Sequence, residues 1–159
     1  MASTISNAKL TVILKEEVKL NNQDYGNRNS VEISGVNEVS QRILSVPTND
    51  TTSILILSDS VGAGTFGISS IKYARLTNLD NSNFVRLTFV SSSASSTDYN
   101  RFDVRLDARQ SYIFTNAKIS GSDNGDTHGS FVDFTSLKAK ADTASVDLEL
   151  FLASSWKIV

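Results

Sequence analysis

The sequence predicts an all-β protein that folds as a single-domain β-sandwich. Ser, Thr and Asn make up 51 of the 159 residues, and these side chains compete with helical backbone hydrogen bonds but suit turns and sheet surfaces. Apolar residues also recur at every second position in several segments, which is the period of a strand with one buried face. We therefore expect eight to ten antiparallel strands in two packed sheets, connected as a jelly roll.

The longest alternation comes first in the chain and predicts one amphipathic strand with a face toward a core. Its even positions are apolar except at Glu16, for which the sequence offers no explanation: Leu10, Val12, Leu14, Val18 and Leu20. The segment Ser53–Ser58 is apolar without alternation, which is typical of a strand buried on both faces.

Further along, two β-branched and aromatic segments flank Leu79–Ser82, so we expect a hairpin with its turn there. Pro47 is expected to close a strand. Residues 136–144 could alternatively form a short helix. The expected strands cover residues 8–20, 31–35, 39–46, 53–58, 70–79, 83–91, 101–107, 111–119, 130–140 and 145–153.

The length of the chain sets its domain organisation. A chain of 159 residues buries roughly 69% of its surface on folding, so it can form a core without disulfides, and it contains no cysteine. We find no internal repeat and no linker, and we expect one domain over 1–159, with 1–7 as a flexible N-terminal arm.

Composition and charge exclude several function classes. No apolar run reaches the roughly 20 residues that a membrane helix needs, and Met1–Ala8 does not resemble a signal peptide. A net charge of -2 gives no electrostatic basis for nucleic-acid binding. We therefore expect neither membrane nor nucleic acid as a partner. The absence of cysteine fits synthesis in a reducing cytoplasm.

The segment Gly62–Gly67 matches the GxGxxG pattern of phosphate-binding loops. A dinucleotide site needs a helix after the glycines, whereas residues 68–79 have the composition of a strand, and Asp80 falls in an Asn/Ser turn. Kinase motifs are missing downstream. We interpret the segment as a connection between strands.

The segment Ser122–Gly129 concentrates oxygen ligands, and Asp123 and Asp126 are its candidate Ca²⁺ ligands. Calcium takes six to eight oxygens, and this segment supplies only two carboxylates, so a structural loop is the preferred interpretation. His128, the only histidine, has no identifiable nucleophile or orienting partner. We expect no metal site here and no catalytic histidine.

Paired carboxylates could indicate glycosidase chemistry. Glu16 and Glu17 would point to opposite faces of a strand, and Asp103 and Asp107 alternate with arginines, as on a solvated sheet face. We therefore expect no enzyme activity, no catalytic residues and no cofactor.

A carbohydrate-binding module is an alternative that stays open, because sugar rings stack on exposed aromatic side chains. The candidates do not fall at i, i+2 on any one strand, so packing in a core or interface is the preferred interpretation. They are Tyr25, Tyr99, Tyr112 and Trp156.

Several segments together resemble a group of small β-rich virion proteins of tailed bacteriophages. In that group a strand, an Asn-Leu-Asp turn and a second strand occupy the middle of the chain, as in the third of these segments. The segments are Leu10–Gly26, Ile33–Thr48, Lys72–Phe89, Phe102–Ile119 and Ser136–Ser154.

The resemblance implies a non-enzymatic structural protein located in the virion and assembled in the host bacterial cytoplasm. Its expected partners are the major capsid protein or other virion proteins and further copies of itself, with a trimer favoured. A capsid decoration (cement) protein on the head exterior is the leading expectation. A tail, fibre or adaptor component and a lectin-like module are the alternatives. Near-zero net charge suits close packing of identical subunits.

Overall fold

The computed structural model describes residues 7–60, 62, 64–91, 101–119 and 131–155. Strands account for most of these residues, and the only helical element among them is one 3₁₀ turn, η1 (Ile68–Ser70), so the all-β prediction is confirmed. No helix in this part of the chain has the length and apolarity needed to cross a membrane. The strands are β1 (Ala8–Glu16), β2 (Lys19–Leu20), β3 (Gln23–Asp24), β4 (Asn27–Val36), β5 (Glu38–Val46), β6 (Thr52–Ser58), β7 (Phe66–Gly67), β8 (Ile71–Asn78), β9 (Val85–Val90), β10 (Arg101–Leu106), β11 (Ser111–Phe114), β12 (Lys118–Ile119), β13 (Val132–Asp133), β14 (Ser136–Ala141) and β15 (Val146–Ser154).

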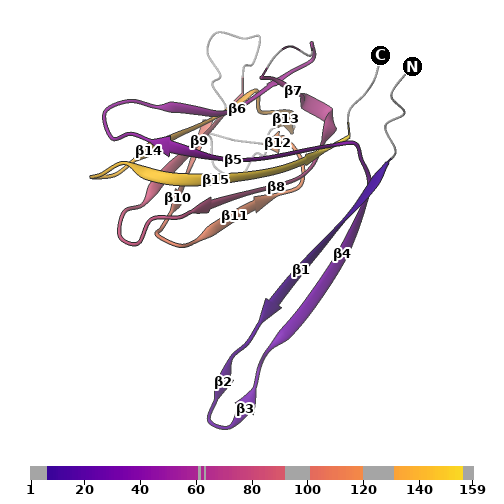
Figure 1. Cartoon of the computed structure of the whole chain (residues 1–159), viewed down its shortest axis with the longest axis vertical. Coiled ribbons are helices and arrows are strands. Elements are labelled where there is room, and N and C mark those ends of the chain that lie inside the picture. Colours follow the sequence, from indigo (N-terminus) through magenta and orange to yellow (C-terminus); the bar gives the residue numbers. More distant parts are fainter. Residues whose placement is uncertain (1–6, 61, 63, 92–100, 120–130, 156–159) are drawn as a thin grey trace.

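Two sheets form the body of the molecule (Figure 1). Sheet I has the order β11-β8-β15-β5, and sheet II has the order β10-β9-β14-β6-β7. All pairs are antiparallel except the short β6–β7 pair. The antiparallel pairs include a nested set, in which β5 pairs with β15, β6 with β14, β8 with β11 and β9 with β10. Strands that are far apart in the sequence therefore lie side by side.

The core lies between the two sheets and is built from alternate positions of their strands. On β15 the inward residues Leu148, Leu150 and Leu152 are fully buried, as the alternation of this segment predicts. Phe89 on β9 is the centre of an aromatic cluster, which it forms with Phe102 (ring centroids 4.6 Å apart), Phe134 (5.2 Å), Tyr112 (5.7 Å) and Phe114 (5.7 Å).

The connection across Leu79–Ser82 is not the hairpin that the sequence predicts. β8 belongs to sheet I and β9 to sheet II, so the chain crosses from one sheet to the other here. The turn chemistry is nevertheless local, because Asp80 Oδ1 accepts hydrogen bonds from the backbone amides of Ser82 (2.7 Å) and Asn83 (2.6 Å). Turn residues identify a reversal of the chain, but they do not specify which sheet the next strand joins.

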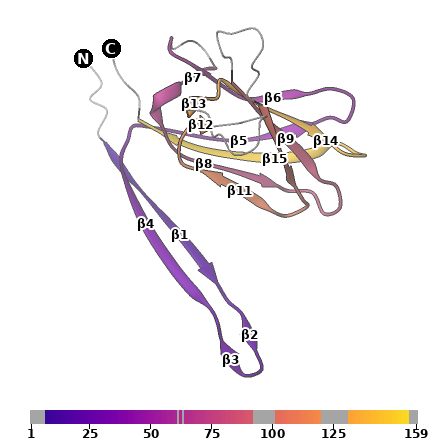
Figure 2. The ribbon, with the colours of Figure 1, turned by 180° about the vertical axis from the view of Figure 1, so that it is seen from behind.

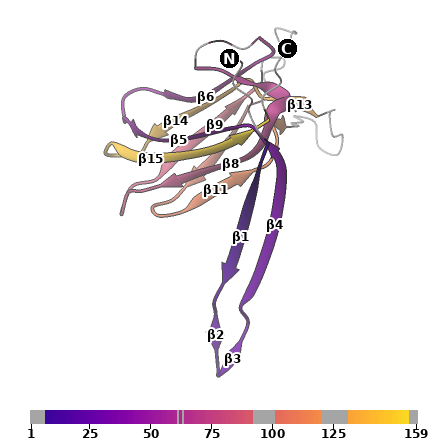
Figure 3. The same cartoon turned by 45° about the vertical axis from the view of Figure 1, so that its right-hand side comes forward.

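The predicted strand 8–20 is also different in the structure. It is divided into β1 and β2, and its partners are β4 and β3, so residues 8–36 form a long, narrow hairpin outside both sheets. We call this segment the long hairpin. Figures 2 and 3 show that it runs away from the sandwich from either viewpoint. Its expected core-facing side is therefore mostly exposed, because two strands have no second layer to cover them.

A bulge sets the direction of the long hairpin. The register shifts between Ala8, which lies opposite Val36, and Lys9, which lies opposite Ser34, so Gly35 is the extra residue. Gly35 has a φ of +74°, in the left-handed region that favours glycine. Because a bulge bends its strand, Gly35 turns β4 away from sheet I, which the chain enters next as β5.

Other expected strands differ in their limits. Segment 31–35 extends to 27–36, 111–119 is divided into β11 and β12, and 130–140 into β13 and β14. Residues 136–141 form a strand, so the alternative helix at 136–144 is wrong. In β6, Ile54 and Leu55 are buried but Ile56 is 44% exposed, so this strand is not buried on both faces throughout. Of the expected flexible segment 1–7, only Asn7 is described.

Candidate interaction surface

The two faces of the long hairpin differ in character. Leu10 lies opposite Ile33 and Val12 opposite Val31, and directly opposed residues of an antiparallel pair share a face. This face, which also carries Leu14, is apolar. The other face is mostly polar and carries the opposed pairs Thr11 and Glu32, Ile13 and Ser30, and Lys15 and Arg28.

The root of the long hairpin packs against the outer face of sheet I. Val36, Tyr73 and Ala153 are buried there, and Leu10, Val12, Ile33 and Phe151 pack against them. The Tyr73 and Phe151 rings meet edge to face at 6.1 Å. The apolar face of the hairpin and the outer face of the sheet therefore fit each other where they meet.

Beyond the root, the long hairpin leaves its apolar side chains in solvent. Leu14 is 49% exposed and Val31 is 57% exposed. Nearer the tip, Val18, Leu20 and Tyr25 are exposed to a similar degree. Single exposed apolar residues are ordinary, but a contiguous set of this kind usually marks an interaction site.

The outer face of sheet I continues this apolar surface. Val39 and Ile43 on β5 are both more than half exposed, and Ile113 on β11 is partly exposed. Their cross-strand partners place them on the same face as Phe151 and Tyr73. A groove of about 380 Å³ lies between the long hairpin and this face, and its lining includes Leu10, Leu14, Ile113 and Phe151.

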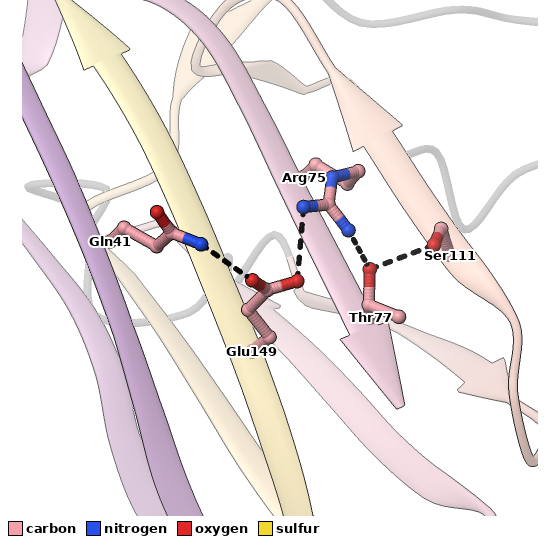
Figure 4. A network of polar contacts seen from close by, with 5 residues as sticks. All are labelled: Gln41, Arg75, Thr77, Ser111 and Glu149. Carbon is pink, nitrogen blue, oxygen red and sulfur yellow. Dashed lines mark hydrogen bonds and ion pairs between the residues drawn. The ribbon is translucent and has the colours of Figure 1, made fainter. Parts of the chain in front are cut away.

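A polar network crosses the same face of sheet I from β5 to β11 (Figure 4). Gln41 Nε2 donates to Glu149 Oε1 at 2.8 Å, and Arg75 Nη2 lies 2.9 Å from Glu149 Oε2. Arg75 also donates to Thr77, whose hydroxyl lies 2.8 Å from the Ser111 hydroxyl. The network holds the four strands in register on the side that faces away from the core.

Glu149 is held ionised by its neighbours in this network. The hydrogen bond from Gln41 lowers the pKa of the Glu149 carboxyl, partial burial opposes that effect, and the positive charge of Arg75 lowers the pKa further. The net result is a pKa below the ordinary value. The face therefore carries a fixed ion pair among its apolar residues.

The outer face of sheet II has a different chemistry. Arg105, Arg86 and Lys140 lie directly opposite one another on three adjacent strands. Asp103 and Asp107 offset part of this charge, at 3.4 Å from Arg86 and 2.7 Å from Arg105. Partial burial raises the pKa of Asp103 and is the largest single effect. The hydrogen bond from Thr88 and the positive charge of Arg101 together outweigh it, so the pKa of Asp103 lies below its ordinary value. This is the charged, exposed sheet face that the sequence indicates.

The remaining candidates from the sequence include five residues that the structure does not describe. Asp123, Asp126, His128, Tyr99 and Trp156 lie outside the described residues. Among the residues that are described, no group of three or more His, Cys, Asp and Glu side chains could hold a metal ion.

Gly62 and Gly64 lie in a turn in which the Thr65 hydroxyl accepts a hydrogen bond from the Gly62 amide at 2.8 Å and donates to the Gly62 carbonyl at 2.9 Å. The short strand β7 and the three-residue turn η1 follow, where a dinucleotide site would need a helix. The turn therefore connects β6 to β7, in agreement with the interpretation of this segment as a strand connection.

The two aromatic candidates that the structure describes lie in different parts of the fold. Tyr25 is exposed near the tip of the long hairpin, whereas Tyr112 packs in the aromatic cluster of the core. Glu16 ends β1, and both it and Glu17 are exposed. The exposed position of Glu16 accounts for a charge on an otherwise apolar face, because that part of the hairpin is in water.

Sequence reasoning missed the outward apolar surface, because alternation reports an amphipathic strand and not what covers it. The sequence did contain one signal of the hairpin, the consecutive residues Asn21 and Asn22. In the structure they lie at its tip with φ values of 49° and 63°. Asn tolerates this conformation and is frequent in tight turns, so these residues pointed to a hairpin between the two alternating segments.

Comparisons with known proteins identify no relative. No family model matches the chain, and no curated protein and no solved structure is significantly similar to it.

Proposed function

We propose that this chain is a non-enzymatic structural protein of a tailed-bacteriophage virion, a decoration protein that binds the exterior of the head and stabilises it. The observation that carries the proposal is the long hairpin, whose uncovered apolar face projects from a rigid sandwich. A projecting amphipathic element reaches a neighbouring subunit in an assembly, and exposed apolar surface of this kind is characteristic of protein contacts.

The strand order supports the jelly-roll interpretation of the sandwich. The nested pairs β5–β15, β6–β14, β8–β11 and β9–β10 are those expected when two Greek keys wrap into two sheets. Viral capsid proteins and lectins both use this architecture, so it is compatible with the proposed virion role and does not by itself distinguish it from a lectin.

The cation row on sheet II supplies a second contact surface. Like charges directly opposite each other in a sheet destabilise it, and Arg105, Arg86 and Lys140 form such a row. An acidic partner surface would neutralise the row and would also guide association. We assign this face to the contact with the head, which leaves the long hairpin for contacts between neighbouring subunits.

Many modest contacts then add up to stable attachment. Subunits that are joined to one another and to the head bind with an effective concentration far above that of a single subunit, so the assembled layer holds more tightly than one copy. This requires no catalytic group and no cofactor.

Quantitative mass spectrometry of purified phage particles tests the proposal. A copy number comparable to that of the major capsid protein supports a head decoration protein. A small number that matches the rotational symmetry of a tail supports the tail or fibre alternative. Absence from the particle overturns the virion role, and specific glycan binding by the purified chain would then support the lectin alternative.

A binding experiment with matched variants tests the role of the long hairpin. Leu14 and Ile13 are adjacent in β1, 49% and 48% exposed, and lie on its apolar and polar faces. Leu14→Glu is expected to reduce co-sedimentation with heads that lack the protein at least tenfold, whereas Ile13→Glu keeps it near the wild-type level. Equal effects of the two variants would contradict a specific role for the apolar face.

A further inference from the structure

We infer that the uncovered apolar face of the long hairpin docks on the outer face of sheet I in a second copy of this chain. This deepens the proposed function, on which it rests, by naming the neighbouring subunit. It is also a property of the purified chain, so it can be tested without particles.

The root of the long hairpin shows that the two surfaces fit. Within one chain, Leu10 and Val12 already pack against Tyr73 and Phe151 of sheet I. The same kinds of side chain continue on both surfaces past this contact. Leu14 and Val31 extend the hairpin face, and Val39, Ile43 and Ile113 extend the sheet face.

Within one copy these remaining surfaces do not close on each other, since an open groove lies between Leu14 of the hairpin and Ile113 of the sheet. The bulge at Gly35 directs the long hairpin away from the sandwich, and the two separate increasingly toward the tip (Figures 1 and 3). The ten residues of β4 span about 33 Å at the usual rise of a strand, which is comparable to the width of a small domain. The hairpin is therefore long enough to reach across the sheet of a neighbour.

The size of the surface matches a stable protein contact. Apart from Ile13 on the polar face, eight of the twelve large apolar side chains that are exposed in the described residues lie on the long hairpin or on the outer face of sheet I. Together they expose about as much as four complete side chains, on the order of 600 Å². A standard interface buries about 800 Å² on each partner.

Charge also permits contact between identical copies. Residues 8–36 contain four basic and four acidic side chains, so the long hairpin is neutral overall. Sheet I adds the Arg75–Glu149 ion pair, which is internally balanced. Two copies therefore meet without strong like-charge repulsion. Because each chain carries both surfaces, reciprocal docking or a closed ring covers all of them at once.

Crosslinking tests this contact directly, since the chain contains no cysteine and any introduced thiol is unique. Val31→Cys and Ile43→Cys, prepared as separate proteins and mixed, are treated with a short bifunctional thiol crosslinker. The expected product is a mixed dimer of the two variants. Ser30→Cys is the matched control, because Ser30 is adjacent to Val31 but lies on the polar face, and its mixed product with Ile43→Cys is expected to be at least tenfold weaker.

Sedimentation velocity of the unmodified chain completes the test. We expect an oligomer that dissociates to monomer in Val31→Glu and persists in Ser30→Glu. A monomer at all accessible concentrations, or crosslinks only between two Val31→Cys chains, would overturn the inference, and the latter would indicate hairpin-to-hairpin contact. A chain that self-associates in this way but is absent from particles would leave the inference standing and overturn the proposed function.

Discussion

The buried side chain of Asn78 joins the two sheets: its Nδ2 donates to the backbone carbonyl of Leu106 at 3.2 Å. It also donates to the Asn83 carbonyl at 2.9 Å, and its Oδ1 accepts from the Asp80 amide at 2.9 Å. One amide therefore satisfies three backbone groups at the point where the chain crosses from sheet I to sheet II.

Replacing Asn78 should destabilise the fold through these unsatisfied groups. We expect Asn78→Ala to lower the free energy of unfolding by about 2–3 kcal/mol, since buried polar groups lose their partners. Urea denaturation measures the change. Asn81→Ala, at an exposed position in the same turn, is the control and should shift stability by less than about 0.5 kcal/mol.

The core depends on Phe89 in the aromatic cluster. Phe89→Ala should destabilise the protein by about 3–5 kcal/mol, because it removes apolar area and leaves a cavity between the sheets. Phe131→Ala removes the same phenyl ring at a position that is 73% exposed. Thermal melts should barely distinguish this variant from wild type. Similar losses for both variants would contradict the position of the core.

The ion pair of Glu149 makes a contribution that depends on pH. Its folded pKa lies below the ordinary 4.5, so the carboxylate stabilises the fold above that value and loses its effect as the pH falls through the folded pKa. Glu149→Gln should therefore lower the free energy of unfolding by about 1 kcal/mol at pH 7, and this difference should close at acidic pH.

Urea denaturation at pH 7 and pH 3 provides the measurement for this variant. Glu32→Gln is the control, because its pair with Lys9 is 3.5 Å long and both side chains are about two-thirds exposed. Its effect should be below about 0.5 kcal/mol at either pH. A difference for Glu149→Gln that does not change with pH would exclude an electrostatic origin.

The cation row on sheet II gives a prediction in which stability and binding change in opposite directions. Lys140→Glu places a carboxylate opposite Arg86, so it should raise the free energy of unfolding by about 0.5 kcal/mol. The same change should weaken binding to heads if that face meets an acidic partner. Lys138 lies opposite the uncharged Thr88, so Lys138→Glu should bring no gain in stability. Stronger head binding by Lys140→Glu would remove sheet II from the proposed contact.

The sandwich should fold without the long hairpin. Among the described residues, the main core begins on β5, where Leu44 packs against it and Val46 is buried. A chain of residues 37–159 therefore keeps the whole main core and loses only Val36 and the hairpin residues that cover Tyr73 and Phe151. Circular dichroism should retain the β spectrum, and melting should stay cooperative with a loss of about 1–3 kcal/mol. A non-cooperative transition would mean that the hairpin is part of the folding unit.

Strand content and local pattern could be predicted from the sequence, because they depend on neighbouring residues. Alternation in Val146–Leu152 correctly indicated a core strand, and a similar alternation in Leu10–Leu20 indicated an amphipathic strand that has no core to face. The two patterns look alike because the hydrophobic period reports that one face is apolar, whichever surface covers it. Which face finds a partner depends on contacts between distant segments.

The interaction surface combines residues that are distant in the sequence. Val31 belongs to the long hairpin and Ile113 to β11, and only the sheet order of β11 and β8 places Ile113 near the hairpin root. The network around Glu149 likewise joins residues from four strands. Such groupings follow from topology, which the local sequence pattern does not encode.

The pairing of β5 with β15 has a consequence for biosynthesis. These strands are hydrogen-bonded along nine residues each, although Val46 and its partner Val146 are 100 positions apart. β15 also lies between β5 and β8 in sheet I, so the middle of that sheet is missing until β15 has left the ribosome. The nascent chain therefore carries unpaired strand edges until then, and the emergence of β15 is the event that allows sheet I to close.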